Sequence, residues 1–509
     1  MSQLGIMTQH SGLPAPEHDD HNIAKFLPGD AQNPRNWSAF RKWTIVASIG
    51  LVDLTVSFGA SGFSPASGDF AAHFGLSSEI AGIGLSIFVL GLAFGPMFIA
   101  PLSEYYGRTA LYLIPYGIFL ICLALSAAID NVPGFFVLRF FSGLFASVTI
   151  ANFGGSIADL FSKNDVGPAM NIFLWAAVCG SPMGFFLMSL VAQSHGWRAV
   201  LWTLFGICAV LWAQLLVVLV PFGNETRHSV LLRRRARRHG KAIPDEAQAR
   251  SLKTLFTVTL ARPFRFLSTE TIVIFGALYN GFLYGISFLF NGAFGLVFGE
   301  RGYGFDTLGV GLCFTGFIVG ISLGPVTGIW QERYYQKSIQ VGQTYSTGSG
   351  SSGESEASAL LEPSRTGAVR HNPEARVQLG KVAAVALPIS LAWFAWTATS
   401  KHWILPILAT SLFGWSFFTL IFMVAIYTEE SYMVYSASAL AGIGLARNVV
   451  GAIFPLIGNI MFERLGPRTA GSIIAGLALL LAPIPFVLER YGPNLRARSP
   501  FAYEHADDE

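Results

Sequence analysis

Twelve long apolar runs constrain this chain of 509 residues more than any other feature. A bilayer core of roughly 30 Å is crossed by about 20 residues of α-helix. Runs of that length lie near 43–65, 79–101, 110–129, 133–156, 168–192 and 198–222, and again near 270–295, 306–330, 380–399, 403–426, 436–461 and 469–489. We therefore predict an all-α polytopic membrane protein with twelve transmembrane helices.

The composition agrees with a surface that faces lipid. Hydrophobic residues make up 52% of the chain and charged residues only 12%, against about 25% charged residues in an average soluble domain. The net charge of +3 is too small to indicate a nucleic-acid partner. The sequence contains no Gly-x4-Gly-Lys-Ser/Thr phosphate loop, no cluster of metal ligands and no nucleophile–base pair. We expect neither an enzyme nor a protein that binds a cofactor or a metal.

A short pattern occurs twice at a fixed distance and indicates an internal duplication. Gly95, Pro96, Tyr105 and Tyr106 recur as Gly324, Pro325, Tyr334 and Tyr335, each 229 residues further along. In both copies the Gly-Pro pair lies in an apolar run and the Tyr-Tyr pair follows beside charged residues. Duplicated halves that meet at the bilayer midplane are typical of secondary transporters. The sequence thus predicts two pseudo-symmetric six-helix bundles.

Basic residues predict the orientation, because Lys and Arg accumulate in cytoplasmic segments. With both termini inside, the outer loops hold few of the 33 basic residues, namely Arg198, Arg301, Lys401, Arg464 and Arg468, while Arg139 and Arg447 fall within runs. We expect a multi-pass protein of the plasma membrane with both termini in the cytoplasm. The sequons at Asn36 and Asn224 would then lie inside and stay unglycosylated.

The same assignment divides the chain into five segments. They are a cytoplasmic tail at 1–42, a first bundle at 43–222, a basic linker at 223–268, a second bundle at 269–490 and a cytoplasmic tail at 491–509. The linker carries an arginine run at 233–238, which we expect to contact anionic lipid of the inner leaflet. The segment 338–378 contains Gly-Ser-Gly-Ser-Ser-Gly and predicts a disordered cytoplasmic insertion. A tolerated insertion is the simpler interpretation of this segment, and a regulatory loop is the alternative.

The loop after the second run suggests a conformational latch. It reads Pro101-Leu-Ser-Glu104-Tyr-Tyr-Gly107-Arg108-Thr109, and Gly95 lies on the helix before it. A carboxylate, a turn glycine and a basic residue in a short loop can form an ion pair that holds two helices in one state. Asp159 and Glu430 end the fourth and tenth runs on the same side, and pairing of Asp159 with Arg108 would complete the latch. The alternative is ordinary topogenic charge at a helix end.

Two ionisable residues within runs are candidates for proton coupling. Asp53 lies near the middle of the first run, where loss of water favours the protonated form of a carboxyl group. A carboxyl that exchanges a proton there could carry it between the two sides; the alternative is a permanently neutral acid bonded to a neighbouring helix. Arg139 lies near the start of the fourth run. A buried arginine in a membrane costs about 2.5 to 17 kcal/mol and normally faces a cavity or a partner, although it can also snorkel to the headgroups.

Further candidates are helix-bending prolines and residues that could line a cavity. Pro182, within Gly180-Ser-Pro182-Met-Gly184, and Pro455 predict bent helices. Polar or aromatic residues within runs that could line a substrate cavity are Asn152, Tyr279, Asn280, Tyr284, Asn291, Trp396 and Trp415. Aromatic faces suit flat or cationic ligands. The alternative for each is plain packing or interfacial anchoring.

These motifs together resemble the major facilitator superfamily, and more closely its fungal twelve-span drug:proton antiporter group. The residues that match the group's signature after the second span are Gly95, Pro96, Pro101, Leu102, Ser103, Glu104, Tyr106, Gly107 and Arg108; Thr109 departs from it. Arg139-Phe-x-x-Gly143, Gly154-Gly155-x-x-Ala158-Asp159 and the segment around Arg447 and Pro455 match as well. The fifth span departs, because one proline and two glycines stand where the group carries a longer glycine-proline run.

The resemblance implies a carrier driven by protons. We expect alternating access with export of an amphiphilic drug, toxin or secondary metabolite, and Arg139 is then implied to act on a neighbouring acid during proton transfer. The expected partners are a small-molecule substrate, protons and membrane lipid, and we expect a monomer. One alternative is a proton-coupled importer of a small organic solute or polyamine. Another is a non-transporting nutrient sensor on a carrier fold.

Overall fold

The computed structural model describes residues 26, 29–161, 166–220, 224–238, 252–348, 373–400 and 402–502. Within these residues all regular structure is helical, and no strand occurs among them. The helices of the first half are α2 (Ala39–Ser61), α3 (Ser67–Phe74), α4 (Ser78–Tyr106), α5 (Arg108–Ala128), α6 (Val132–Ala146), α7 (Val148–Leu160) and α8 (Val166–Leu219). Two helices of the linker follow, α9 (His228–Arg238) and α10 (Leu252–Thr269). Those of the second half are α11 (Thr271–Phe298), α12 (Thr307–Gly348), α13 (Gln378–Thr397), α14 (Ile404–Tyr432), α15 (Ser436–Leu481) and α16 (Ile484–Ala497).

Twelve membrane crossings follow from these helices, as the apolar runs predicted. Ten helical stretches in the described residues are long and apolar enough to cross a bilayer. Two of them, Val166–Leu219 and Ser436–Ala497, are double, because the backbone turns at Gly196 (φ 74°) and at Gly466 (φ 77°). Positive φ favours glycine, and at Gly196 a Cβ would also lie only 2.8 Å from Oδ2 of Asp69. That carboxylate accepts the Trp197 amide at 2.9 Å and holds the start of the second helix.

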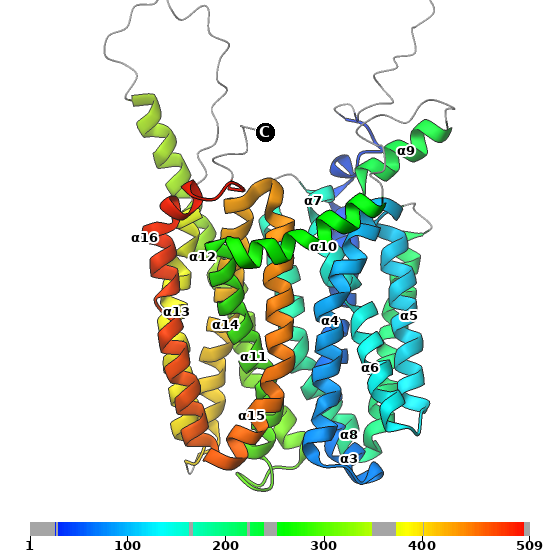
Figure 1. Ribbon diagram of the computed structural model, residues 1–509, viewed down its shortest axis with the longest axis vertical. Coiled ribbons are helices and arrows are strands. Elements are labelled where there is room, and N and C mark those ends of the chain that lie inside the picture. The colour runs from blue at the N-terminus through cyan, green and yellow to red at the C-terminus, as the bar shows by residue number, and fades with distance from the viewer. Residues whose placement is uncertain are drawn as a thin grey trace, which may run out of the picture.

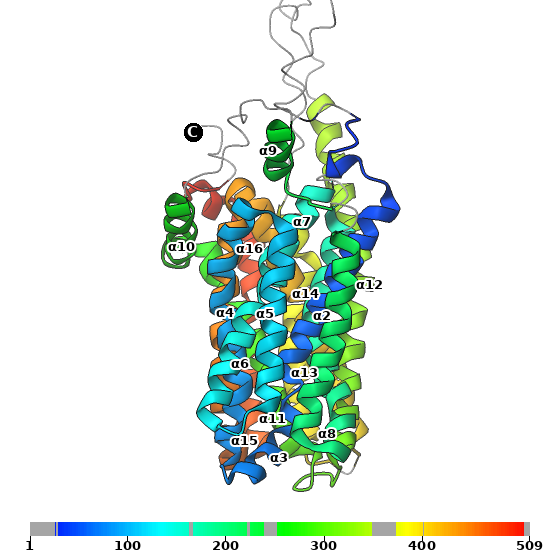
Figure 2. The ribbon, with the colours of Figure 1, turned by 90° about the vertical axis from the view of Figure 1, so that its right-hand side faces the viewer.

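The helices form two upright bundles side by side (Figure 1). The first contains α2 to α8 and the second α11 to α16, and α4 stands against α15 at the seam between them. Asn448 of α15 donates to the Leu92 carbonyl of α4 at 3.4 Å, and Trp175 of α8 donates to Ser322 of α12 at 3.1 Å. Figures 1 and 2 place α9 and α10 at one end of the molecule, called here the linker end, and α3 at the opposite end.

The linker helix α10 touches both bundles where they meet. Its residues Leu260 and Leu267 pack with Ala93 and Met97 of α4 and with Leu445 of α15. In Figure 2, α10 lies along the edge of the molecule at the level where the upright helices end. An apolar helix face in this position covers the seam without adding a charge to it.

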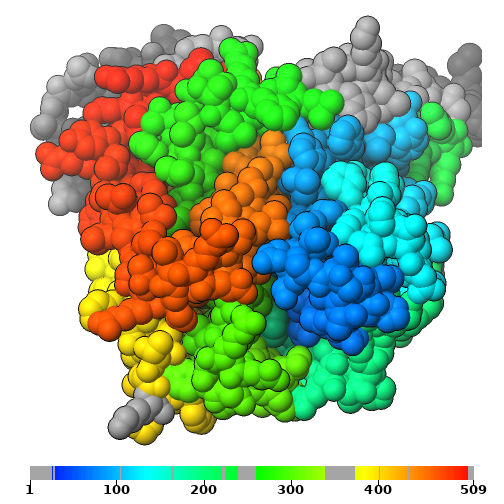
Figure 3. Space-filling model, turned by 60° about the horizontal axis from the view of Figure 1, so that its bottom comes forward, coloured from blue at the N-terminus to red at the C-terminus, as the bar shows by residue number. Residues whose placement is uncertain are grey.

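At the opposite end the two bundles are joined by polar and aromatic contacts. The Gln193 side chain donates to Asp306 at 2.8 Å and accepts from the Leu308 amide at 3.1 Å. The rings of Phe185 and Phe314 stack with centroids 4.3 Å apart. Figure 3 shows the two halves in contact across this end. The molecule is therefore closed on that side.

Some boundaries differ from those expected. Helix α12 continues to Gly348, and a 3-10 helix, η4 (Pro373–Val377), leads into α13. Both ends of the segment 338–378 are therefore helical; residues 338–347 contain no proline, and residues 349–372 lie outside the described part of the chain. The linker 223–268 contains α9 and α10, and α16 continues past residue 490 to Ala497.

Glycines set the distance between α4 and α6. A Cβ at Gly91 would lie 2.2 Å from the Phe140 carbonyl oxygen, and one at Gly143 would lie 2.0 Å from that of Phe88. At Gly95 a Cβ would meet the Ser147 hydroxyl at 1.9 Å and the Leu144 carbonyl at 2.3 Å. Small residues let membrane helices approach closely and gain dispersion contacts. Gly95, predicted as part of the latch, is thus a packing residue.

We expect Gly95→Ala to lower the free energy of unfolding by about 1–3 kcal/mol, because the added methyl group forces two backbones apart. The apparent melting temperature of the purified protein in detergent is the measurement. Gly206→Ala is the matched control, since a Cβ there has nothing within 4 Å and alanine favours a helix. Equal melting temperatures for the two variants would contradict the close crossing of α4 and α6.

Candidate functional site

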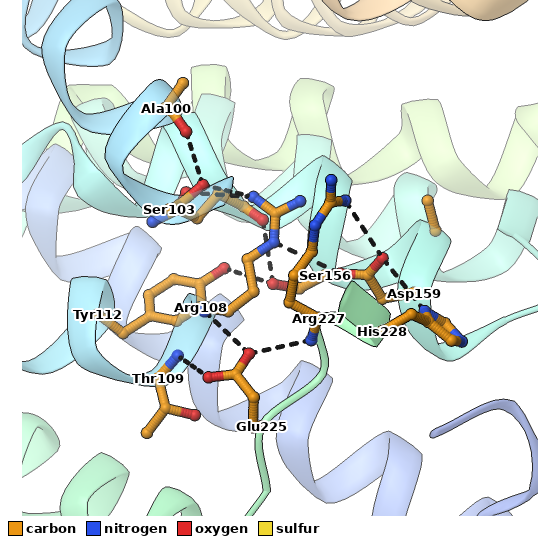
Figure 4. Close-up of polar contacts among 12 residues, drawn as sticks. Ala100, Ser103, Arg108, Thr109, Tyr112, Ser156, Asp159, Glu225, Arg227 and His228 are labelled. Carbon is orange, nitrogen blue, oxygen red and sulfur yellow. Dashed lines mark hydrogen bonds and ion pairs between the residues drawn. The ribbon is translucent and has the colours of Figure 1, made fainter. Parts of the chain in front are cut away.

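A buried network surrounds Arg108 at the linker end (Figure 4). Arg108 begins α5, and its side chain donates to Ser103 at 2.7 Å and to Asp159 at 3.4 Å. Only 9% of the Arg108 side chain and 10% of the Asp159 side chain are exposed. The structure therefore brings together two of the predicted latch residues. Asp159 also lies 3.9 Å from Arg227 and 3.7 Å from His228, so one carboxylate faces three basic groups.

Gly107 makes room for a carboxylate that the sequence did not single out. Its backbone has φ 100° and ψ 164°, and a Cβ there would lie 2.4 Å from Oε2 of Glu225. The Glu225 carboxylate accepts the amides of Arg108 at 2.9 Å and of Thr109 at 3.3 Å. Amides at a helix N-terminus lack partners in the helix, and the helix dipole favours an anion there. Glu225 therefore caps α5.

Glu225 lies in Asn224-Glu225-Thr226, which by sequence is only a sequon. In the structure Asn224 and Glu225 are buried, and the Asn224 side chain accepts from Arg41 Nε at 2.7 Å. The sequence feature that could have predicted this role of Glu225 is the position of its carboxylate, shortly after the sixth span and on the same side of the membrane as Arg108. The Glu104 side chain lies outside the described part of the chain, so its predicted place in the latch stays a prediction.

The second bundle contains a separate network of the same design. Arg376 precedes α13 and donates to Glu430 of α14 at 2.8 Å and also to Glu332 of α12, with its guanidinium 3.3 Å from the Tyr335 ring centroid. Arg376 thus joins the ends of two helices at the start of a third, as Arg108 does. Glu430, predicted at the end of the tenth run as Asp159 is at the end of the fourth, pairs within its own bundle with Arg376, which precedes span nine. Its part in a latch stays a prediction.

Arg139 is fully buried and acts on the end of α2. Its guanidinium donates to the carbonyls of Gly59 at 3.0 Å, Ala60 at 3.4 Å and Gly84 at 3.2 Å. Gly59 and Ala60 belong to the last turn of α2, whose carbonyls have no partner in the helix and attract a cation. The described hydrogen-bond partners of Arg139 are therefore backbone carbonyls, and the Arg139 side chain does not snorkel to the surface.

Asp53 lies on α2 with 1% of its surface exposed. One carboxylate oxygen accepts a hydrogen bond from the Thr149 hydroxyl of α7, and Oδ2 has no hydrogen-bond partner among the described residues. The charge of Asp53 acts electrostatically on Tyr112 and Tyr116 of α5. The site is thus an isolated acid among hydroxyl groups.

Across the seam stands Arg447 of α15, which the sequence marked only as a charge within a span. Its guanidinium lies 4.3 Å from the ring centroid of Tyr284 on α11, and its charge acts on Asp53. Both Arg447 and Asp53 act electrostatically on Tyr284. The neighbouring Asn448 bonds to α4 and so holds this part of α15 against the first bundle. The structure therefore places one acid and one base, from different bundles, near the same tyrosine.

The predicted cavity residues lie in four different places. Tyr279, Asn280, Tyr284 and Asn291 are buried on α11, and the last three recur at helical spacing with Ser287 on one face of that helix. Asn152 is buried too, but it accepts from Arg108 at 3.4 Å and belongs to the network at the linker end. Trp415 donates to Thr327 at 3.0 Å inside the second bundle.

Trp396 does not fit a cavity lining. It is 60% exposed, and the Arg468 guanidinium covers its ring at 4.0 Å. This is the place of an interfacial aromatic anchor, which was its alternative interpretation. The predicted bending prolines, Pro182 and Pro455, are buried within α8 and α15. The non-helical backbone in these helices occurs at Gly196 and Gly466 rather than at the prolines.

A small pocket lies elsewhere, between α12, α13 and α14. Gly324, Arg376, Phe418 and Met423 are among its lining residues, and none of the predicted cavity residues lines it. It is contained in one bundle and is almost entirely apolar. The polar seam around Asp53 and Arg447 is the stronger candidate, because it combines buried charge with a contact between the parts that would move.

The fold and the buried charges at the seam define a two-bundle membrane carrier. The sequence profile of the Major Facilitator Superfamily matches residues 49–353. The chain belongs to this superfamily, which confirms the resemblance of its motifs.

The similarity of this chain to named transporters extends over nearly its whole length. The chain is 34% identical to "Major facilitator-type transporter sorT" of Penicillium rubens, over 96% of this chain and 90% of that protein. It is 33% identical to "Major facilitator superfamily multidrug transporter mdrA" of Aspergillus fumigatus, over 96% and 76%. Among solved structures, the proton:xylose symporter XylE is similar with a TM-score of 0.59 at 15% identity, over 89% of this chain and 97% of that one. The last comparison shows the fold alone.

The Arg108–Asp159 contact predicts energetic coupling between the two side chains. In a double-mutant cycle with Arg108→Gln and Asp159→Asn, we expect a coupling free energy on the order of 0.5–3 kcal/mol, because the buried partners share one network. Thermal unfolding of the purified variants measures it. The exposed pair Arg198–Asp130 at the opposite end is the control and should couple by less than about 1 kcal/mol. Additive effects at Arg108 and Asp159 would contradict the network.

Proposed function

We propose that this protein is a proton-coupled exporter of amphiphilic small molecules that works by alternating access. The observation that carries the proposal is the buried acid Asp53, on which the charge of Arg447 in the other bundle acts. When the bundles rock about the seam, the surroundings of a group at the seam change. A group there that binds a proton can therefore couple proton movement to the change of state.

Both protonation states of Asp53 have support in this place. The ionised carboxylate accepts from Thr149 and is stabilised by the charge of Arg447. The protonated acid is favoured by burial away from water. Ionisable residues inside membrane proteins commonly mark proton or substrate paths, because their burial is costly. The acid is thus suited to exchange a proton during each cycle.

The direction and the substrate class are supported by similarity. The sequence is similar to proteins named as transporters over nearly its full length, one of them as a multidrug transporter. Further relatives at 30–32% identity are named as efflux pumps. An exporter of such compounds must accept molecules that dissolve in the membrane, hence our choice of amphiphilic substrates. Import of an organic solute or polyamine is the competing function.

We further propose a plasma-membrane location with the linker end in the cytoplasm. Arginines gather at that end, on α9, α10 and η4, whereas the opposite end holds Arg198, Arg301, Arg464 and Arg468. The Gln193 contacts to Asp306 and Leu308 then close the outer side. The working unit is proposed to be a monomer that binds its substrate and protons.

The networks around Arg108 and Arg376 suggest how the bundles move. The described contacts of each network do not cross the seam. They therefore make the helix ends within each bundle rigid and do not join the two bundles to each other. We expect Arg108→Ala to slow turnover while insertion into the membrane stays intact, because a loosened bundle transmits movement poorly. Compound resistance of cells at matched expression measures turnover. Arg198→Ala is the control, and a normal rate for Arg108→Ala would exclude this role.

Inverted plasma-membrane vesicles with an acidic lumen test the function directly. A radiolabelled compound, chosen from a panel for which cells with the protein are more resistant, should accumulate in the lumen as protons leave. Asp53→Asn should abolish this accumulation but keep exchange of labelled for unlabelled compound, because asparagine cannot titrate. Asp130→Asn, on the exposed surface, should behave as the wild type.

The alternatives predict different results in the same vesicles. An importer would lose its compound from the lumen under this gradient. A sensor that does not transport would move no compound under either gradient. Either result would refute the proposed export.

A further inference from the structure

Asp53 and Arg447, one on each bundle, each carry a buried polar atom with unmet hydrogen-bonding capacity. The atoms are Oδ2 of Asp53, an acceptor, and Nε of Arg447, a donor, and neither has a hydrogen-bond partner among the described residues. No carboxylate of those residues lies within salt-bridge distance of Arg447. Leaving a buried polar group without a hydrogen-bond partner is costly, and more so when the group is charged. A donor and an acceptor that both lack hydrogen-bond partners indicate a ligand that supplies the missing partners.

The second bundle adds a flat surface and further polar groups. The Tyr284 ring lies beneath Arg447, with the guanidinium carbon 4.3 Å from the ring centroid. On the same helix the Tyr279 hydroxyl and the Asn280 side-chain oxygen also lack hydrogen-bond partners among the described residues. An aromatic face attracts a planar ring, and the polar groups on this helix can bond to oxygen-bearing substituents.

The charges disfavour an organic cation at this place. Thr149 of α7 bonds to Asp53, and the titratable groups that interact with it electrostatically are Tyr112 and Tyr116 of α5, Tyr284 of α11 and Arg447 of α15. Arg447 is the only cation of this set, and it nearly balances Asp53. A cationic ligand at Asp53 would meet the repulsion of Arg447 in a low-dielectric region, where such repulsion is large.

We propose that the substrate is an uncharged aromatic compound that carries both a hydroxyl group and a carbonyl group and bridges Asp53 and Arg447 when the seam opens. Its hydroxyl donates to the Asp53 carboxylate, its carbonyl accepts from the Arg447 guanidinium, and its ring lies against Tyr284. This inference rests on the proposed function and names the substrate class of that same site.

Such an uncharged ligand accounts for the exchange of substrate against protons. The hydroxyl needs the ionised carboxylate as a strong acceptor, so a proton on Asp53 weakens substrate binding and the two compete for the same oxygens. A carboxylate ligand would do the opposite, because a second anion beside Asp53 favours the protonated form, and acid and proton would then travel together. Of these two ligands, the uncharged one links substrate departure to proton arrival.

Calorimetric binding to the purified full-length protein in detergent tests the substrate class. The probes are 7-hydroxyflavone, flavone without the hydroxyl, 7-hydroxyflavan without the carbonyl, flavone-7-carboxylate and a trimethylammonium flavone. We expect 7-hydroxyflavone to bind at least tenfold tighter than each other probe. Its affinity should fall at least tenfold as the pH is lowered through the titration of Asp53. Tightest binding of the cation, equal affinities across the series, or no binding of any probe would each overturn the inference.

Variants assign the contacts to residues. Arg447→Gln should weaken binding of 7-hydroxyflavone at least tenfold but that of 7-hydroxyflavan much less, whereas Arg447→Lys, which keeps the charge, should restore part of the affinity. Asp53→Asn should bind with the low-pH affinity of the wild type at every pH. Arg468→Gln, on the exposed surface beside Trp396, is the matched control. Melting temperatures of all variants separate lost contacts from lost folding.

The vesicle assay separates this inference from the proposed function. Proton-driven accumulation of a panel compound, together with Arg447→Gln binding 7-hydroxyflavone as the wild type does, would refute the substrate class and leave export standing. The predicted binding pattern without any proton-driven movement would support the site and refute export.

Discussion

Burial of charge in a membrane is the constraint on which the rest of this structure depends. A charged side chain inside the bilayer is costly unless another group meets it, and here the described partners come from different helices in each case. Arg139 of α6 meets the open carbonyls at the end of α2, and Arg108 of α5 meets Asp159 of α7. Each such contact ties helices that are distant in sequence. The polar residues therefore decide which helices belong together, and the apolar residues fill the space between them.

The two halves solve the same problem with different residues. A basic residue at the start of the third helix of each bundle joins the ends of the second and fourth helices. In the first bundle Ser103 occupies the place that Glu332 takes in the second, 229 positions later. The second network can therefore balance its arginine with two carboxylates, whereas the first uses one carboxylate and a helix cap from Glu225. The duplication preserved an arrangement in space more closely than the residues that form it.

The sequence was sufficient to predict the spans, the duplication and the pairing of Arg108 with Asp159, because each depends on position along the membrane normal. It could not predict contacts that depend on how a helix is rotated. Trp396 could face a cavity or the lipid, and only packing decides this. The charge of Arg447 acts on Asp53 across the seam where α15 lies against α4 at Asn448, and this depends on how both helices are rotated. The partner of Glu430 was not predicted because Arg376 follows a long insertion between the two helices. The role of Glu225 was not predicted because its segment was interpreted only as a glycosylation sequon.

The left-handed glycines at Gly196 and Gly466 have a practical consequence for experiments at the opposite face. Each reverses the chain within a single residue, so these two connections present almost no loop to an antibody, a protease or a labelling reagent. The connection between α11 and α12 is longer and contains Gly304, around which a Cβ would find open space. An epitope inserted there would report which side of the membrane that face occupies.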